Sequence, residues 1–194
     1  MSKKITIIDY GMGNLYSVQN ALRSIGAEPV VTSDASVIAQ AEKILLPGVG
    51  AFGDCMANLE KSGLIPVITE SLHSGKPFLG ICLGMQLLFE GSDEAPGVKG
   101  LGFFKGKVRL LDTELKIPHM GWNKLELRSP SPLLEGAEVN TFTLCTASMR
   151  SQRTEALLPR SATMAWRLLL PWDAVMFRPF SSIRKSRAES ACAC

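Results

Sequence analysis

Long apolar runs and regularly spaced cysteines are both missing from this sequence. No stretch approaches the roughly 20 apolar residues that a membrane-spanning helix needs, and the run from Ile5 to Ile8 is too short for the core of a signal peptide. The five cysteines are an odd number without the spacing of a disulfide framework, and Cys192 and Cys194 lack the second ligand pair of a zinc site. We therefore expect a cytoplasmic protein with no membrane anchor, no disulfide scaffold and no bound metal.

Glycine is absent from the last 54 residues, although residues 1–140 contain all 17 glycines. Arginine has the opposite distribution, with three in residues 1–140 and seven in residues 141–194. The first segment holds 13 Lys and Arg against 15 Asp and Glu, a net of −2, whereas the second holds 8 against 3, a net of +5. The overall charge of +3 is therefore confined to the end of the chain and gives no reason to expect nucleic acid as a partner. The composition changes near Asn140.

Apolar β-branched runs alternate with amphipathic segments through the first 90 residues. Predicted strands cover residues 4–10, 29–32, 43–46 and 77–81, and predicted helices cover residues 14–25, 34–41, 52–61 and 65–73, with a fifth beginning at Leu83. This alternation predicts an α/β fold with an open, mostly parallel sheet flanked by helices on both faces. Short runs with Gly and Pro, such as residues 106–110 and 124–127, predict antiparallel strands on the far edge of that sheet.

The segment Gly80-Ile81-Cys82-Leu83-Gly84 has the G-x-nucleophile-x-G form of a nucleophile elbow, a strained turn between a strand and a helix. Glycines flank the nucleophile because a Cβ at either position would clash. The helix that begins at Leu83 directs its positive dipole end at the sulfur of Cys82, and the backbone N–H of Leu83 is available to an oxyanion. The alternative is a buried structural cysteine in a core strand, which is the commoner role of cysteine.

A second glycine-containing turn, Pro47-Gly48-Val49-Gly50, also follows a predicted strand. Two glycines allow successive backbone N–H groups to converge on one point, as in an oxyanion hole. A Pro-Gly turn is by itself ordinary, so only its pairing with the turn at Cys82 indicates acyl transfer.

Three further features receive structural interpretations. Gly11-Met12-Gly13-Asn14 begins like a dinucleotide fingerprint, but Tyr16 stands where the third glycine belongs, so we expect no nucleotide cofactor. Cys55, inside a predicted helix, is interpreted as structural. His73, beside a Ser-Gly stop, is interpreted as a solvated histidine at a helix end.

Four segments together carry a family resemblance: IDYGMGNL at residues 8–15, LPGVG at residues 46–50, GICLGMQ at residues 80–86 and PHMGWN at residues 118–123. They resemble the class I glutamine amidotransferases, which have a flavodoxin-like fold, and within that class the glutaminase subunits of imidazole glycerol phosphate synthase, an enzyme of histidine biosynthesis. The resemblance covers residues 4–140, which we interpret as an incomplete glutamine amidotransferase domain.

The resemblance implies a role for each matching segment. Cys82 would form a γ-glutamyl thioester while glutamine is hydrolysed to glutamate and ammonia, and Gln86 would contact the bound glutamine. The backbone of Gly48, Val49, Gly50 and Leu83 would stabilise the oxyanion. No metal or organic cofactor is implied. The ammonia would pass to a (β/α)8-barrel cyclase subunit in a heterodimer. The residues expected to face that cyclase are His119, Met120, Gly121, Trp122 and Asn123.

The general base that such chemistry requires is missing. A cysteine amidase needs a base for the thiol proton and a carboxylate that orients the base, and the family supplies both in a Phe-His-Pro-Glu segment near the C-terminus. This chain contains only His73 and His119, both before residue 141. We therefore expect the 194-residue chain to be inactive and poorly folded.

A change of reading frame near Asn140 would explain both the missing residues and the aberrant composition. Read two bases later, the codons of residues 180–187 permit Gln-Phe-His-Pro-Glu-Lys-Ser, and residues 142–149 and 163–167 permit two further strings typical of the family. The histidine would span the codons of Ser182 and Ile183, and the glutamate those of Arg184 and Lys185. On this hypothesis residues 141–194 are an out-of-frame tail that replaces the end of the domain.

Other interpretations remain open. The chain resembles other class I glutaminases, such as those serving pyridoxal phosphate or anthranilate synthesis. Without a base it also fits a catalytically dead binding or scaffold subunit. Residues 141–194 alone are also compatible with a basic, partner-binding tail.

Overall fold

The computed structural model describes residues 3–110, 119–124, 141–146 and 148–150. Several sequence predictions lie outside these residues. They include the shifted-frame positions Ser182, Ile183, Arg184 and Lys185, and most of the segment 141–194.

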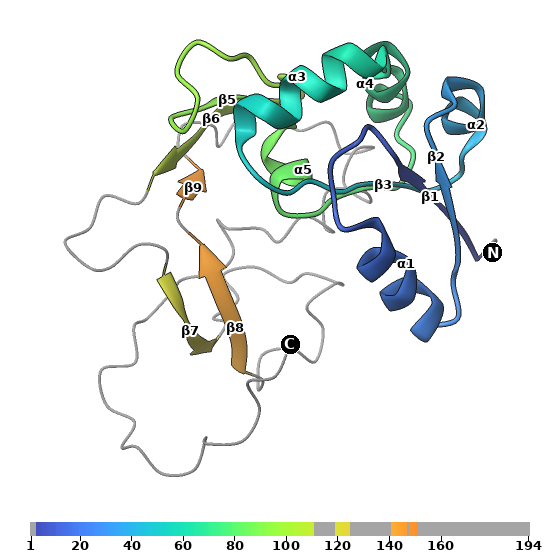
Figure 1. Ribbon diagram of the computed structural model, residues 1–194, viewed down its shortest axis with the longest axis horizontal. Coiled ribbons are helices and arrows are strands. Elements are labelled where there is room, and N and C mark those ends of the chain that lie inside the picture. The colour runs from blue at the N-terminus through green and yellow to red at the C-terminus, as the bar shows by residue number, and fades with distance from the viewer. Residues whose placement is uncertain (1–2, 111–118, 125–140, 147, 151–194) are drawn as a thin grey trace.

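A four-stranded parallel sheet, called the central sheet below, lies between the helices of the described chain (Figure 1). Its strands are β1 (Lys4–Ile8), β2 (Glu28–Thr32), β3 (Ile44–Leu46) and β4 (Phe78–Gly80). They lie in the order β2-β1-β3-β4, and every neighbouring pair is parallel. All three residues of β3 are buried, as expected for a parallel strand covered on both faces. The predicted open, mostly parallel α/β sheet is therefore confirmed.

Helices connect these strands and lie on both sides of the sheet. They are α1 (Leu15–Ser24), α2 (Ala35–Gln40), α3 (Phe52–Ser62) and α4 (Ile65–His73). Figure 1 shows α1 on one face of the sheet and α3 and α4 on the opposite face. The side chain of Asn14 accepts a hydrogen bond from the Ser17 backbone N–H at 3.1 Å and so caps the first helix.

The main core lies between the sheet and helices α2 to α4. Fully buried members come from the strands, from these three helices and from the turn after residue 86: Ile8, Leu46, Ile38, Phe52, Cys55, Leu59, Ile68, Leu87 and Leu88. Helix α1 contributes no fully buried residue. None of the helices in the described part of the chain has the length and apolarity required of a membrane-spanning segment.

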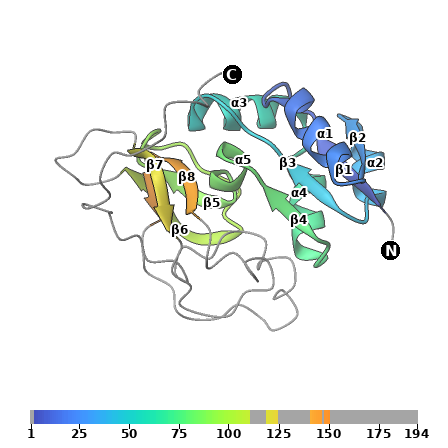
Figure 2. The same cartoon turned by 90° about the horizontal axis from the view of Figure 1, so that it is seen from below.

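The remaining strands form two small sheets to one side of the four-stranded sheet (Figures 1 and 2). They are β5 (Phe89–Ser92), β6 (Phe104–Leu110), β7 (His119–Lys124), β8 (Thr141–Thr146) and β9 (Ser148–Arg150). Strand β6 pairs with β5 in parallel and with β9 antiparallel, and β7 pairs antiparallel with β8. The strand predicted at residues 106–110 is present within β6 and pairs antiparallel with β9. It belongs to a separate sheet, so the prediction that it extends the far edge of the four-stranded sheet is wrong.

The backbone after Cys82 explains the difference. Helix α5 (Leu83–Gln86) is a single turn, shorter than the amphipathic helix that the sequence predicts. The N–H groups of Leu101 and Phe104 donate to the carbonyls of Leu87 and Leu88 at 2.7 and 2.9 Å. These bonds occupy the carbonyls that a longer helix would use, and they hold the following strands against the end of α5 instead of against β4. Of the strand predicted at residues 124–127, only Lys124 lies among the described residues, at the end of β7, so this strand stays a prediction.

Candidate active site

The carboxyl ends of β1, β3 and β4 meet at one edge of the sheet because the three strands are parallel. Helix α1 leads from β1 to β2 on one side of β1, whereas β3 lies on its other side, so the connections diverge between β1 and β3. Open α/β sheets bind their ligands in the crevice at such a point. The turns that follow β3 and β4 contain the two glycine motifs identified in the sequence.

Cys82 occupies a strained position between β4 and α5. Its φ of 55° and ψ of −119° are typical of glycine, and it has the only positive φ of a non-glycine residue in the part of the chain that the structure describes. Such a conformation costs about 1–3 kcal/mol and persists where the surroundings impose it. The side chain of Cys82 is exposed. A sharp turn that presents an exposed cysteine is the geometry of a nucleophile elbow.

The glycines on either side of Cys82 are required by close backbone contacts. A Cβ on Gly80 would lie 2.5 Å from the Met85 Cα, and a Cβ on Gly84 would overlap the carbonyl oxygen of Leu46. The predicted reason for both glycines, a clash with any Cβ, is therefore confirmed. The contact at Gly84 also shows that the elbow packs directly against the end of β3.

The turn after β3 lies against the elbow. A Cβ on Gly48 would be 2.5 Å from the Gly84 nitrogen and 2.8 Å from the Leu83 Cβ. Within the described part of the chain, the backbone N–H groups of the four predicted oxyanion donors, Gly48, Val49, Gly50 and Leu83, donate to no acceptor. The structure thus brings the two predicted motifs together and leaves N–H donors available on both, which is what stabilisation of an oxyanion requires.

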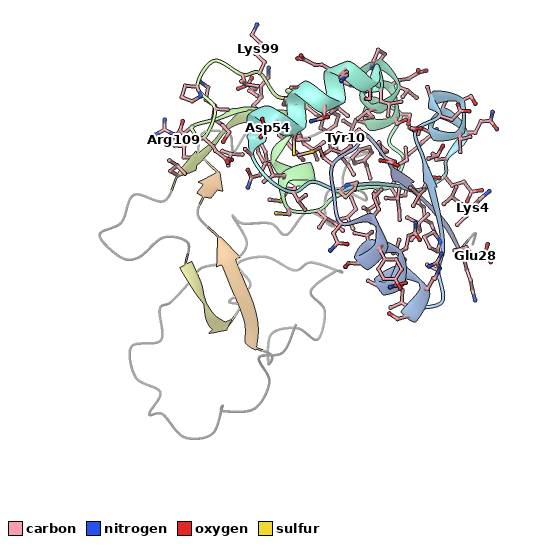
Figure 3. All side chains as sticks on the ribbon, viewed as in Figure 1. Lys4, Tyr10, Glu28, Asp54, Lys99 and Arg109 are labelled. Carbon is pink, nitrogen blue, oxygen red and sulfur yellow. The ribbon has the colours of Figure 1, made fainter. Side chains whose placement is uncertain are left out.

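Two buried side chains bind the carbonyls of this turn from the side of the core. The Tyr10 hydroxyl donates to the Pro47 carbonyl oxygen at 2.8 Å, and the Cys55 thiol donates to the Val49 carbonyl oxygen at 3.2 Å. Tyr10 is 4% exposed and Cys55 is fully buried. Figure 3 shows Tyr10 between α3 and the strands.

Burial raises the pKa of both side chains, Tyr10 and Cys55. Burial, with a smaller contribution from the neighbouring Cys55, raises the pKa of Tyr10 far above its ordinary value. Burial also raises the pKa of the Cys55 thiol, against smaller opposing effects of the Tyr10 hydroxyl and the Val49 backbone. Both groups therefore retain their protons at neutral pH and act as hydrogen-bond donors.

Sequence reasoning missed these two residues at the site. The prediction that Cys55 is structural agrees with its full burial, but the sequence does not predict its bond to the Val49 carbonyl. Tyr10 enters the prediction only as part of the segment at residues 8–15. One feature of the sequence could have placed Tyr10 near the site: it ends the predicted first strand, and the carboxyl end of β1 lies at the same edge of the sheet as those of β3 and β4.

Gln86 lies in α5, and its backbone N–H donates to the Cys82 carbonyl at 3.2 Å. Its side chain is half-buried, with the Oε1 atom fully buried. The structure thus places Gln86 one helical turn after Cys82, close to the edge where a substrate would bind.

Neither histidine of the chain is placed beside Cys82 by the described structure. His73 ends α4, the helix that leads into the start of β4, so it lies at the opposite edge of the sheet from Cys82. Its Nδ1 lies 2.7 Å from the Thr69 carbonyl oxygen, and its exposed ring contacts Phe103 edge-on, which fits the predicted solvated role.

The segment predicted to face a cyclase forms most of β7. In the register of the β7–β8 pair, His119 lies opposite Thr146 and Asn123 lies opposite Phe142. Between them lie Met120, Gly121 and Trp122. This pair forms a sheet separate from the one that ends at Cys82 (Figure 1). Among the described residues no three His, Cys, Asp or Glu side chains form a group able to hold a metal ion.

Comparison with known proteins matches residues 6–155 to the family described as "Glutamine amidotransferase class-I". The chain is 51% identical over 148 residues to imidazole glycerol phosphate synthase subunit HisH of Aquifex aeolicus, covering 76% of this chain and 72% of that protein. It is 52% identical over 138 residues to the subunit of the same name from Methanothermobacter thermautotrophicus, covering 71% of this chain and 69% of the relative.

A solved structure described as "Crystal structure of glutamine amidotransferase" superimposes with a TM-score of 0.59 and 16% identity over 77% of this chain and 75% of that one. At that identity the likeness shows the fold alone. It agrees with the central parallel sheet and its flanking helices.

Proposed function

The chain belongs to the class I glutamine amidotransferase family, and from this premise we propose that it is the glutaminase subunit of an imidazole glycerol phosphate synthase. The observation that carries the proposal is the exposed Cys82 at a positive φ beside a turn with free backbone N–H groups. The 51% identity to a subunit of that synthase supports this choice within the family. We place the amidotransferase domain in residues 1–140 and the protein in the cytoplasm.

The proposed chemistry begins when the sulfur of Cys82 attacks the side-chain carboxamide carbon of glutamine. The carbonyl π electrons move to oxygen, and the N–H groups of Leu83 and of the turn Gly48 to Gly50 stabilise the resulting oxyanion. The C–N bond then breaks, and the nitrogen leaves as ammonia after gaining a proton. Water attacks the γ-glutamyl thioester, glutamate is released and the thiol is restored. Gln86 would contact the bound glutamine, and no metal or organic cofactor takes part.

The proton transfers need a base, and His73 at the opposite edge of the sheet does not provide one. We propose that the base and its carboxylate are encoded in the shifted frame, across the codons of Ser182 and Ile183 and of Arg184 and Lys185. The change in composition near residue 140 supports this proposal. Resequencing codons 135–150 tests it, because an intact frame would refute it.

We propose a (β/α)8-barrel cyclase as the partner that consumes the ammonia, with His119, Met120, Gly121, Trp122 and Asn123 facing it. The support is that the relatives are named as subunits of a synthase. Co-purification with the cyclase of the same organism tests the proposal. Stable association with a pyridoxal phosphate or anthranilate synthase in its place would overturn it in favour of another class I glutaminase.

The activity test compares four chains in the presence of the cyclase: the 194-residue chain, the frame-restored chain and the Cys82→Ala variant of each. Glutamate release by the restored chain, lost in its Cys82→Ala variant, is the expected result. A restored chain that binds the cyclase but releases no glutamate would favour the second candidate, a binding or scaffold subunit. The specific observation in favour of that candidate is that no histidine of the described structure is placed beside Cys82.

A further inference from the structure

We infer that Tyr10 and Cys55 are positioning residues that hold the turn Pro47 to Gly50 in the shape of an oxyanion hole. This inference rests on the proposed function, because it gives a role to groups that hold the donors rather than contact the substrate. It follows from two buried hydrogen bonds, from the geometry of the peptide unit and from the packing around the turn.

Tyr10 fixes the first peptide unit of the turn. Its hydroxyl donates to the Pro47 carbonyl at 2.8 Å from a ring that is 4% exposed. Strand β1 ends two residues before Tyr10, so the hydroxyl is anchored to the centre of the sheet. Water has little access to this bond, and a buried carbonyl left without its donor would carry the full penalty of desolvation. The Pro47 carbonyl is therefore held on the core side of the turn.

Cys55 fixes the third peptide unit from a different element. Its thiol donates to the Val49 carbonyl at 3.2 Å from the first turn of α3, and its side chain is fully buried. The two donors thus approach the same turn from β1 and α3, and they bind alternate carbonyls.

The trans peptide bond converts these two contacts into an orientation of the N–H donors. In a planar trans peptide the C=O and the N–H of the next residue point in opposite directions. With the Pro47 and Val49 carbonyls directed at Tyr10 and Cys55, the N–H groups of Gly48 and Gly50 are directed away from the core. These are two of the N–H groups that have no acceptor in the described part of the chain.

Glycine does not hold this shape by itself. Gly50 has a φ of 90°, and glycine passes between conformations at little steric cost. The neighbours of the turn limit its translation, since a Cβ on Gly13 would lie 3.0 Å from Pro47 and a Cβ on Gly48 would lie 2.5 Å from Gly84. These contacts do not fix the rotation of the peptide units, which the hydrogen bonds from Tyr10 and Cys55 restrict.

The experiment compares two reactions of Cys82 in the frame-restored chain, because the 194-residue chain is expected to be poorly folded. Acylation by p-nitrophenyl acetate passes through a tetrahedral oxyanion and transfers the acetyl group from p-nitrophenol to sulfur. Alkylation by iodoacetamide displaces iodide from carbon without forming an oxyanion. Peptide-level mass spectrometry follows modification at Cys82, and the ratio of the two rate constants reports stabilisation of the oxyanion separately from exposure or nucleophilicity of the sulfur. The same ratio in denaturing urea gives the unfolded reference.

The variants are Tyr10→Phe and Cys55→Ala, each with a matched control. Tyr16→Phe removes the same hydroxyl from a side chain that is 74% exposed, and Cys55→Ser retains a donor at position 55. Removal of an oxyanion donor costs roughly 10²–10³-fold in rate, so misorientation of one donor is expected to lower the acylation-to-alkylation ratio by about 10-fold. Tyr16→Phe is expected to leave the ratio unchanged, and Cys55→Ser is expected to restore most of it. Circular dichroism checks that each variant retains the fold of the parent chain.

Two results would overturn the inference: a ratio that Tyr10→Phe and Cys55→Ala leave unchanged, or a ratio in the parent chain equal to that in urea. The proposed function fails by a different result, namely absence of Cys82-dependent glutamate release from the frame-restored chain with its cyclase. If the restored chain is a glutaminase but its Cys82 acylation does not depend on Tyr10 and Cys55, the proposed function stands and only this inference is refuted.

Discussion

Alanine in place of Gly84 should separate the two turns that form the candidate site. Its methyl group would overlap the Leu46 carbonyl oxygen and lie 2.8 Å from the Leu46 carbonyl carbon and 2.9 Å from that of Pro47. All three are backbone atoms of β3 and the turn after it, so no flexible side chain can move aside. Relief of the clash requires β3 and the elbow to move apart, which also displaces Gly48 from Leu83.

The expected cost lies at the upper end of the range for overpacked sites, about 3 kcal/mol. For a domain of this size that corresponds to a fall in Tm of roughly 6–12 °C, at about 2–4 °C per kcal/mol. It would remove a large share of a total stability that is typically about 5–15 kcal/mol. The measurement is thermal unfolding followed by circular dichroism on the frame-restored chain.

Gly53→Ala is the matched control because it makes the same chemical change inside helix α3. A Cβ at Gly53 would meet only the Ala95 Cβ at 3.5 Å and the Val98 side chain at 4.0 Å, which are ordinary contacts. Gly53 is the second residue of α3, so the gain from replacing it by alanine is at most the roughly 0.5–1 kcal/mol found for a glycine in a helix interior. The two substitutions should therefore shift Tm in opposite directions. A Gly84→Ala variant that melts within about 2 °C of the parent, a shift worth under 1 kcal/mol, would refute the close packing on which the site depends.

Three further predictions concern other parts of the molecule. Asn14→Ala removes the cap of α1 and should lower the free energy of unfolding, measured by urea titration, by about 1 kcal/mol. The control Asn20→Ala, at an exposed position of the same helix, should not lower it. The pKa values of Tyr10 and Cys55 are raised in the folded chain, so the unfolded chain loses these protons at lower pH than the folded chain does. The stability that the two groups contribute is therefore complete below a pH of about 8.5 and declines as the pH rises above that value. Urea midpoints at neutral and alkaline pH test this, and a Tyr10→Phe, Cys55→Ser double variant whose midpoint falls as steeply as the parent's would contradict it. The 194-residue chain is expected to release no more glutamate with the cyclase than its Cys82→Ala variant, and turnover above that level would show that another residue serves as base.

The central sheet and the elbow could be predicted because local patterns determine them. Each of the first four strands is a short apolar run, and Asn14 and Asp34 cap the helices that follow two of them. Cys82 was recognisable because its flanking glycines satisfy a steric requirement within a few residues of the chain. The meeting of this turn with the one at Gly48 followed from the parallel order of the strands.

The features that sequence reasoning missed depend on contacts between distant segments. The end of α5 is determined by Leu101 and Phe104, whose backbone bonds to the carbonyls of Leu87 and Leu88 have no signature in residues 83–90. The donors Tyr10 and Cys55 reach the same turn only because folding brings α3 and the segment after β1 to it. Composition and periodicity report burial at such positions, but they do not report which carbonyl a buried hydroxyl or thiol binds.

The backbone conformation at Cys82 sets stability and chemistry against each other. Glycine adopts a φ of 55° without steric strain, so a Cys82→Gly chain is expected to be more stable than the parent, although it has no nucleophile. A design or selection scheme that scores thermal stability alone would therefore discard the one side chain on which the reaction depends. Any effort to engineer this scaffold has to hold position 82 fixed and seek its stability elsewhere.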